Sequence, residues 1–134
     1  MDFSNKVSVV TGGTRGIGKS IVESLLNQGS QVIFTGTKEQ DNVQVPKGSH
    51  YFPLNFNDDQ SIYDFLNVID SDFKRIDVLV NNAGINIISE IDQIDVADLR
   101  SVLNVNLIGP ALITSSIAKK MKVNQYGRIV NISS

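Results

Sequence analysis

The chain has 134 residues, a formal net charge of −2 at pH 7 and a composition that is 41% hydrophobic and 19% charged, which is typical of one soluble globular domain. Because no run of Lys or Arg stands out, the charge pattern favours neither nucleic acid nor an anionic membrane as a partner. The absence of Cys excludes disulfides and a thiolate nucleophile, and a single His argues against a metal site built by the protein.

The N-terminal residues 1–6 show no charged segment followed by an apolar one, so the sequence predicts no secretion signal. We also expect no membrane span, since no apolar stretch approaches the roughly 20 residues that a bilayer requires. These two expectations make the cytoplasm the predicted location.

The first third of the chain predicts a strand, a turn, a helix and a second strand. Residues 6–11 contain an apolar run that ends in glycines, which indicates a strand followed by a tight turn. Gly29 predicts the end of the helix, and residues 31–35 form a second β-branched run. The apolar residues at helical spacing between them are Ile17, Ile21, Val22, Leu25 and Leu26.

The alternation continues through the rest of the chain. Residues 38–49 predict a loop with room for one helical turn, and residues 50–56 a third strand. Asn57 and Gln60 have capping-box spacing ahead of a second helix, and residues 77–82 predict a buried fourth strand. Asp95 can cap a long helix, and Gly127 precedes a fifth strand at residues 128–132. The long helix carries Val96, Leu99, Leu103 and Leu107.

Strands that alternate with helices predict an α/β fold with a parallel sheet and right-handed crossovers. We expect a Rossmann-type doubly wound sheet of about five strands in the order 3-2-1-4-5. Residues 1–134 are then one nucleotide-binding domain.

A glycine motif lies between the first predicted strand and the first predicted helix, in Thr11-Gly12-Gly13-Thr14-Arg15-Gly16-Ile17-Gly18. A helix N-terminus with unpaired N–H groups and a positive dipole end can hold a pyrophosphate. Glycines at 12, 16 and 18 remove side chains where the turn tightens, where a phosphate approaches and where the helix meets the strand. The motif therefore predicts a dinucleotide site.

In its motifs the chain resembles the short-chain dehydrogenases/reductases, whose glycine motif has the spacing T-G-x-x-x-G-x-G. The resemblance also includes Asn81-Asn82-Ala83-Gly84, Asn106 within Asn104-Val105-Asn106-Leu107, and Arg128-Ile129-Val130-Asn131-Ile132-Ser133-Ser134, in the order of the family. It extends over the whole chain, and within the family the chain is most similar to 3-oxoacyl-[acyl-carrier-protein] reductases and similar carbonyl reductases. It implies an oxidoreductase that transfers hydride between a nicotinamide cofactor and a carbonyl or alcohol substrate, with a 3-oxoacyl thioester as one candidate.

The resemblance places Asn55 and Phe56 beside the adenine, and Asn82, Ala83 and Gly84 along the adenosine ribose. Asn55 stands where the family more often has Asp, and its carboxamide can still accept and donate hydrogen bonds there. With the glycine motif and Thr37, the expected cofactor-binding residues are Gly12, Gly13, Thr14, Arg15, Gly16, Ile17, Gly18, Thr37, Asn55, Phe56, Asn82, Ala83 and Gly84.

The residues after the second predicted strand favour NADP(H) over NAD(H). A site for NAD usually has a carboxylate there, which binds the ribose hydroxyls and would repel a 2′-phosphate. This chain has Thr35-Gly36-Thr37-Lys38 instead, and Arg15 can add a guanidinium that suits phosphate geometry. Glu39 lies close enough in sequence to leave NAD(H) open.

Two catalytic residues follow from the resemblance. Ser134, with Ser133 as the alternative, would polarise the substrate carbonyl, and Asn106 would hold a water of the proton relay through its backbone carbonyl. Pro110 lies four residues after Asn106 and has no N–H to bond that carbonyl, which predicts a helix kink with a free oxygen. The other interpretation is a plain helix end near Gly109 and Pro110.

The Tyr-x-x-x-Lys motif of the family does not occur within these residues, because Asn55, Asn67 and Val130 stand four positions after the three tyrosines. We therefore expect an incomplete domain that is inactive alone, with an unpaired fifth strand as its edge. We read Tyr51, Tyr63 and Tyr126 as packing or surface residues. The complete form is expected to be a homo-oligomer that acts on a small molecule. A non-catalytic nucleotide-binding module and a truncated inactive product remain alternatives.

Overall fold

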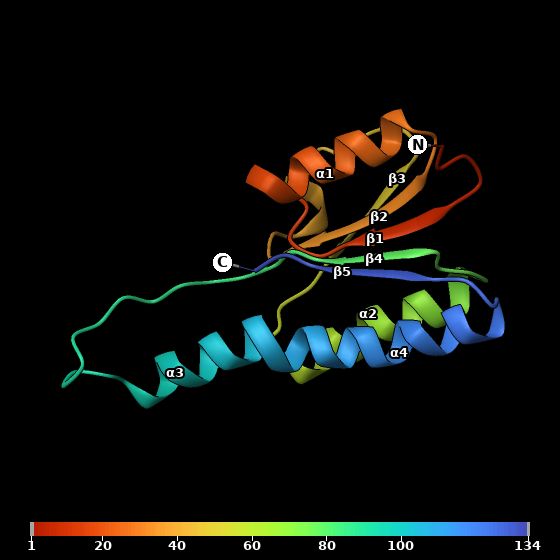
Figure 1. The fold of residues 1–134 in the computed structure, drawn as a ribbon. Coiled ribbons are helices and arrows are strands. Elements are labelled where there is room, and N and C mark those ends of the chain that lie inside the picture. The colour runs from red at the N-terminus through yellow and green to blue at the C-terminus, as the bar shows by residue number, and fades with distance from the viewer. Residues whose placement is uncertain (1, 134) are drawn as a thin grey trace.

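The computed structural model describes residues 2–133 and contains a five-stranded sheet between layers of helices (Figure 1). The strand order is β3-β2-β1-β4-β5, and every neighbouring pair is parallel. The predicted fold class and strand order are therefore confirmed. The strands are β1 (Val7–Val10), β2 (Gln31–Gly36), β3 (Ser49–Pro53), β4 (Val78–Asn81) and β5 (Arg128–Asn131).

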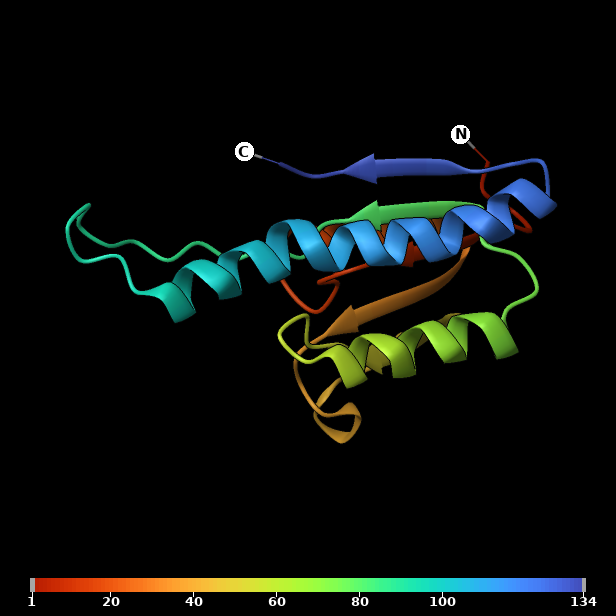
Figure 2. The same ribbon diagram turned by 90° about the horizontal axis from the view of Figure 1, so that it is seen from below.

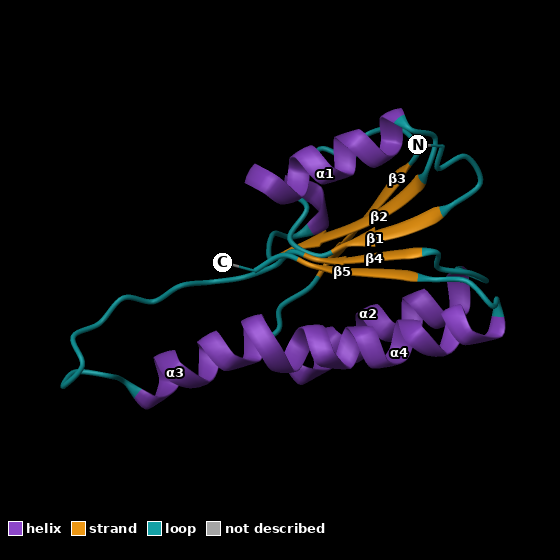
Figure 3. Ribbon diagram, viewed as in Figure 1, coloured by secondary structure: helices purple, strands orange, loops and turns teal. Residues whose placement is uncertain are grey.

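Helices cover both faces of the sheet, with α1 on one face and α2 and α4 on the other (Figures 1 and 3). The loop between β2 and β3 contains one 3-10 turn, η1 (Gln40–Asn42), as its composition predicted. The helical segments are α1 (Gly16–Asn27), α2 (Asp59–Asp72), α3 (Val96–Leu103), the π-helical turn η2 (Asn104–Ile108) and α4 (Gly109–Val123).

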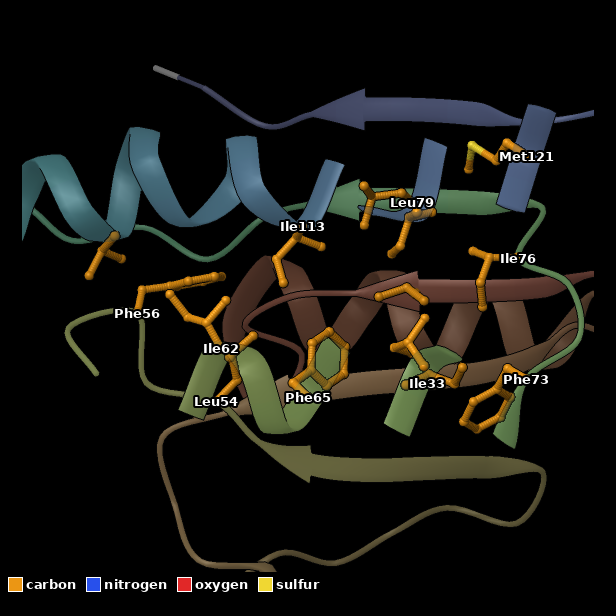
Figure 4. Packing of buried hydrophobic residues seen from close by; sticks show 14 residues of the cluster. Ile33, Leu54, Phe56, Ile62, Phe65, Phe73, Ile76, Leu79, Ile113 and Met121 are labelled. Atoms are coloured by element: carbon orange, nitrogen blue, oxygen red, sulfur yellow. The ribbon is translucent and has the colours of Figure 1, made fainter. Parts of the chain in front are cut away.

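Two buried clusters of side chains hold these layers together. Successive residues of a strand point to opposite faces, so that Val9 packs toward α2 and α4 whereas Val10 packs toward α1. On the α2 and α4 face, Phe65, Ile113 and other large side chains are almost fully buried (Figure 4). Because both faces of β4 are covered, its continuous apolar run Val78–Val80 is explained.

Two helix boundaries agree with the sequence. Gly29 follows Gln28, the C-cap residue of α1, with φ +86°, a left-handed conformation that glycine adopts without strain. The carboxylate of Asp95 accepts hydrogen bonds from the N–H groups of Ala97 and Asp98 at 2.7 and 3.2 Å, so it caps α3 as expected.

Two boundaries differ clearly from the sequence prediction, whereas the other strand ends differ by at most one residue. The third strand ends at Pro53 rather than at residue 56, because the chain turns at Asn55, whose Oδ1 accepts the N–H of Asn57 at 3.0 Å. The cap of α2 is Asp58, which accepts the N–H of Gln60 at 3.0 Å, and not Asn57. The side chain of Asn57 instead contacts another helix.

The segment Val96–Val123 forms one continuous helix, which is long and apolar enough by length and composition to cross a membrane. The expectation that no segment has these properties is wrong by those two criteria. Figure 2 shows that α4 lies along the sheet, where Ile113, Ile117 and Met121 are buried in the core. The apolar residues that face away are exposed, among them Leu99, Leu103, Leu107 and Leu112.

Candidate functional site

An open cleft of about 600 Å³ lies at the carboxyl ends of the strands, where the loops after β1, β2, β3 and β4 meet. β1 is flanked by β2 on one side and by β4 on the other, so the chain connections diverge at this point. Ligands of doubly wound sheets bind at such a switch point. Of the expected cofactor-binding residues, the cleft is lined by Gly12, Thr14, Arg15, Gly16, Ile17, Gly18, Thr37, Asn55, Phe56, Asn82, Ala83 and Gly84.

Gly13 is the expected residue that the structure places outside the cleft. Its N–H donates to the carbonyl of Thr35 at 2.8 Å, and a Cβ at this position would press on Phe34 and Val22. The residue thus packs the glycine loop against β2 and the buried side of α1.

Close packing explains the glycines at 12 and 18. A Cβ on Gly18 would overlap the carbonyl oxygen of Gly12 and the side-chain amide of Asn82. Gly12 has φ +68°, and a Cβ there would lie 2.9 Å from the Cα of Ala83. No side chain fits between these backbones, so the start of α1 lies directly against the loop after β4.

Hydrogen bonds fix the glycine loop to the segment after β4. The buried hydroxyl of Thr11 accepts the N–H groups of Asn82 and Ala83, each at 3.1 Å. The amide Nδ2 of Asn82 donates to the carbonyls of Thr11 and Gly12 at 3.0 and 3.1 Å. These four hydrogen bonds hold Thr11 and Gly12 against the segment after β4 and so fix the start of the glycine loop.

The N-terminus of α1 opens into the cleft without a competing side chain. Arg15 occupies the N-cap position but makes no side-chain cap hydrogen bond, and the first turn has no acidic residue. The first N–H groups of a helix have no acceptor within it, and the helix dipole adds positive potential. The arrangement suits an anion such as a pyrophosphate.

The cleft carries the positive charge of Arg15. Arg15 and Thr37 line it and are exposed, whereas the cleft lining within residues 2–133 includes no Asp or Glu. Glu39 and Lys38 both lie outside the lining of this cleft. Lys38 faces a separate groove of about 520 Å³ between α1 and the η1 loop.

The loop after β3 is ordered by its own polar groups. The N–H of Asn55 donates to the hydroxyl of Ser61 at 2.9 Å, while its Oδ1 accepts the N–H of Asn57. Phe56 is only 6% exposed and anchors the loop in the hydrophobic core. Asn55 thus presents a side chain already oriented by the turn, and one lone pair of its Oδ1 is used within the protein.

Asn106 lies in the π-helical turn and holds the loop after β4. Its Oδ1 accepts the N–H of Ile85 at 2.9 Å, and its Nδ2 donates to the carbonyl of Ile85 at 2.8 Å. The interpretation of a helix end near Gly109 and Pro110 is wrong, since α4 begins there without a break. The helix continues through this point by changing to π geometry, in which the N–H of Gly109 donates to the carbonyl of Asn104 five residues earlier.

The remaining residues singled out in the sequence are Ser133, Ser134 and the three tyrosines. Ser134 lies outside the described residues, and Ser133 is exposed just after β5. Tyr51 is buried and donates its hydroxyl to the carbonyl of Lys38, and burial raises the pKa of this phenol. Tyr63 and Tyr126 are exposed, so the three tyrosines are packing or surface residues as predicted.

Sequence reasoning missed several residues of the cleft wall, which are neighbours of the expected ones. Val105 comes from the π-helical turn and Ile85 from the loop after β4. The π-helical turn was also missed, although Gly109-Pro110 inside an apolar helical pattern is a signal for irregular hydrogen bonding. The other residues that were missed are Thr35, Gly36, Leu54 and Asn57.

Comparison with known proteins connects this geometry to a family. The family model described as short chain dehydrogenase matches residues 6–134. The 3-oxoacyl-[acyl-carrier-protein] reductase of Aquifex aeolicus is 40% identical to this chain over 140 residues, and the one of Escherichia coli is 31% identical over 138 residues. The alignments cover 98% and 100% of this chain but only 56% and 57% of those two proteins.

Solved structures show the same relation. A metagenomic short-chain oxidoreductase in complex with NADP has a TM-score of 0.88 and 28% identity, covering 98% of this chain and 62% of that one. A short-chain dehydrogenase from Streptomyces avermitilis has a TM-score of 0.87 and 29% identity, covering 100% of this chain and 51% of that one. The chain thus spans little more than half the length of the relatives it matches, and it belongs to the short chain dehydrogenase family.

Proposed function

We propose that this chain is the nucleotide-binding part of an NADP(H)-dependent oxidoreductase that interconverts a carbonyl and an alcohol. The cleft at the switch point supports this proposal, because it combines an uncapped helix N-terminus with walls from four strand-end loops. The bound nicotinamide would supply the hydride. The names of the reductases in Aquifex aeolicus and Escherichia coli make a 3-oxoacyl thioester the first substrate class to test.

The preference for NADP(H) rests on one observation. Arg15 and Thr37 line the cleft, and within residues 2–133 no Asp or Glu does so. A guanidinium and a hydroxyl can both donate to a 2′-phosphate. Nothing in that wall would repel the additional negative charge. NAD(H) lacks the 2′-phosphate, so Arg15 and Thr37 would stabilise it less than NADP(H).

The proposed catalytic groups are Asn106 and Ser134. Asn106 has its side chain committed to Ile85, so its contribution would come from its backbone carbonyl, which Pro110 cannot bond. That oxygen would hold a water for proton transfer. Ser134 would donate a hydrogen bond to the substrate oxygen, where negative charge develops during reduction.

We expect the chain to bind NADPH more tightly than NADH, and Arg15→Ala to weaken NADPH binding by about tenfold or more. A charge-assisted hydrogen bond contributes roughly 1.5–3 kcal/mol, and about 1.4 kcal/mol corresponds to a factor of ten. Fluorescence titration with both nucleotides measures this directly. Arg100→Ala is the matched control, because Arg100 is exposed on α3 and does not line the cleft. Equal affinities for the two nucleotides would contradict the assignment.

A polypeptide of these 134 residues alone should bind the nucleotide without steady turnover. None of its tyrosines is followed four residues later by Lys, so it offers no such pair as a general acid. We also expect self-association, because Ile129, Val130 and Ile132 of the β5 edge are 41–44% exposed. An assay with NADPH and a small reactive ketone, combined with light scattering, tests both statements. Sustained turnover by a chain of confirmed mass would refute the expected inactivity, and a monodisperse monomer would refute the expected self-association.

A longer form of the chain distinguishes the alternative functions. The enzyme would carry Tyr-x-x-x-Lys downstream of these residues and reduce a ketone, whereas a nucleotide-binding module without catalysis or a truncated inactive product would bind nucleotide in this cleft and lack that motif. We propose a homo-oligomer as the complete form, supported by the exposed apolar side of the Val96–Val123 helix. We propose the cytoplasm as its location and a small carbonyl or alcohol as its substrate.

A further inference from the structure

The π-helical turn lies between two walls of the cleft and contacts both. On one side is the loop after β3, which includes Asn55 and Phe56. On the other side is the loop after β4, which includes Ile85. The turn itself contributes Val105 to the cleft lining. Because the π-helical turn contains Asn106 and contacts both loops, its position sets the distance of each loop from Asn106.

Asn57 forms the hydrogen bonds between the β3 loop and this helix. Its Nδ2 donates to the hydroxyl of Ser101 at 2.9 Å, and its Oδ1 accepts from the Nδ2 of Asn104 at 3.3 Å. Within residues 2–133 these are the hydrogen bonds that join the two segments, since no backbone bond does so. The backbone N–H of Asn57 also donates to Asn55, so the same residue orients the adenine side of the loop.

Asn104 is the first residue of the π-helical turn and connects it to α4. Its carbonyl accepts the N–H of Gly109, which sets the wider spacing of the turn. Gly109 lies so close to Phe56 that a Cβ would overlap the aromatic ring, and Figure 4 shows Phe56 beside this helix. The β3 loop is thus joined to both ends of the turn, by Asn57 at Asn104 and by Phe56 at Gly109.

We propose that Asn57 and Asn104 are positioning residues that couple occupation of the adenine end of the cleft to the conformation of the π-helical turn, and so to Asn106. The cofactor part of this inference rests on the proposed function. A nucleotide that contacts Asn55 further restrains Asn57 through the hydrogen bond between them, and the carboxamide of Asn57 in turn restrains Asn104. Asn106 follows two residues later and transmits the restraint to Ile85 through its two hydrogen bonds. The coupling is therefore a contiguous series of contacts.

Hydrogen exchange of the 134-residue chain, followed by mass spectrometry, measures this coupling without nucleotide. Asn104→Ala should raise exchange about two- to tenfold in residues 54–58, and Asn57→Ala should do so in residues 104–109, as expected for loss of a neutral hydrogen bond. Asn57→Asp should restore slow exchange, since a carboxylate can accept from both Asn104 and the hydroxyl of Ser101. Asn67→Ala, an exposed change on α2, is the control and should leave both segments unchanged.

The second arm adds NADPH at a concentration that saturates every variant. In the parent chain, NADPH should slow exchange in residues 104–109, and in Asn57→Ala this slowing should be lost although the site is occupied. A purely structural role would instead raise exchange equally with and without nucleotide. The inference is overturned if the reciprocal effects are absent without nucleotide, or if Asn57→Ala retains the full slowing at saturation. A parent chain that binds neither NADPH nor NADH refutes the proposed function, whereas the first arm still decides whether the two segments are coupled.

Discussion

Gly18→Ala should weaken NADPH binding by about 10- to 100-fold. The added Cβ would overlap the carbonyl of Gly12 and the amide of Asn82, so the glycine loop must move away from the loop after β4. Overpacking of this kind costs roughly 1–3 kcal/mol, and the displaced N–H groups would no longer converge on a pyrophosphate. Helix propensity favours Ala over Gly by about 1 kcal/mol, so the loss of binding should exceed the loss of stability.

Titration with NADPH and thermal unfolding of the same samples separate these two effects. Ser20→Ala is the matched control, because Ser20 lies on the exposed side of α1 outside the cleft lining. We expect the affinity of this variant to equal that of the parent chain. If Gly18→Ala bound NADPH with unchanged affinity, the glycine loop would not be the phosphate site.

Asp77→Asn should lower the free energy of unfolding by about 2 kcal/mol at neutral pH, the range of hydrogen bonds to a charged group. The carboxylate of Asp77 is 1% exposed and accepts the N–H of Val7 at 2.9 Å and hydrogen bonds from Arg75. Lys6 lies 3.7 Å away. This cluster joins β1 and β4 at the end of the sheet opposite the cleft, so nucleotide affinity should change little.

The contribution of Asp77 should depend on pH in a defined direction. Burial by itself raises the pKa of Asp77, but the hydrogen bonds from Arg75 and Val7, together with the charges of Arg75 and Lys6, lower it further than burial raises it. The folded pKa is thus below the unfolded value of about 3.9. A lowered carboxyl pKa stabilises the folded state above the unfolded pKa, and this stabilisation is lost as pH falls through the folded pKa.

Urea unfolding between pH 3 and pH 7 tests this dependence. The difference between the parent chain and Asp77→Asn should be constant above about pH 5 and should shrink below about pH 4. Asp70→Asn is the control, because Asp70 is 84% exposed in its ion pair with Lys120 and surface pairs contribute about 0–1 kcal/mol. A difference that persists unchanged at pH 3 would mean that Asp77 acts through packing rather than through its charge.

The sequence alone determined the fold class, the strand order and the family of this protein. The fold class follows from local patterns, namely apolar runs of strand length, helical spacing such as Val22 with Leu25, and a glycine motif at a strand-to-helix turn. The strand order follows from the Rossmann-type topology that these patterns indicate. Asp95 as a helix cap and Gly29 at a helix end were predictable for the same reason. Each of these residues acts on its immediate neighbours in the chain.

Only the tertiary structure decided features in which distant segments compete for the same groups. The pattern at residues 57–60 predicted a cap at Asn57, but its carboxamide bonds to Ser101 and Asn104, and Asp58 caps α2 instead. Likewise, Gly109 is adjacent to Phe56 because the helix packs there against the loop after β3. The helix does not end near Gly109 but adopts π geometry just before it. The spacing of apolar residues along one segment indicates which side chains share a face. Which other element packs against that face depends on how burial of the core brings the layers together.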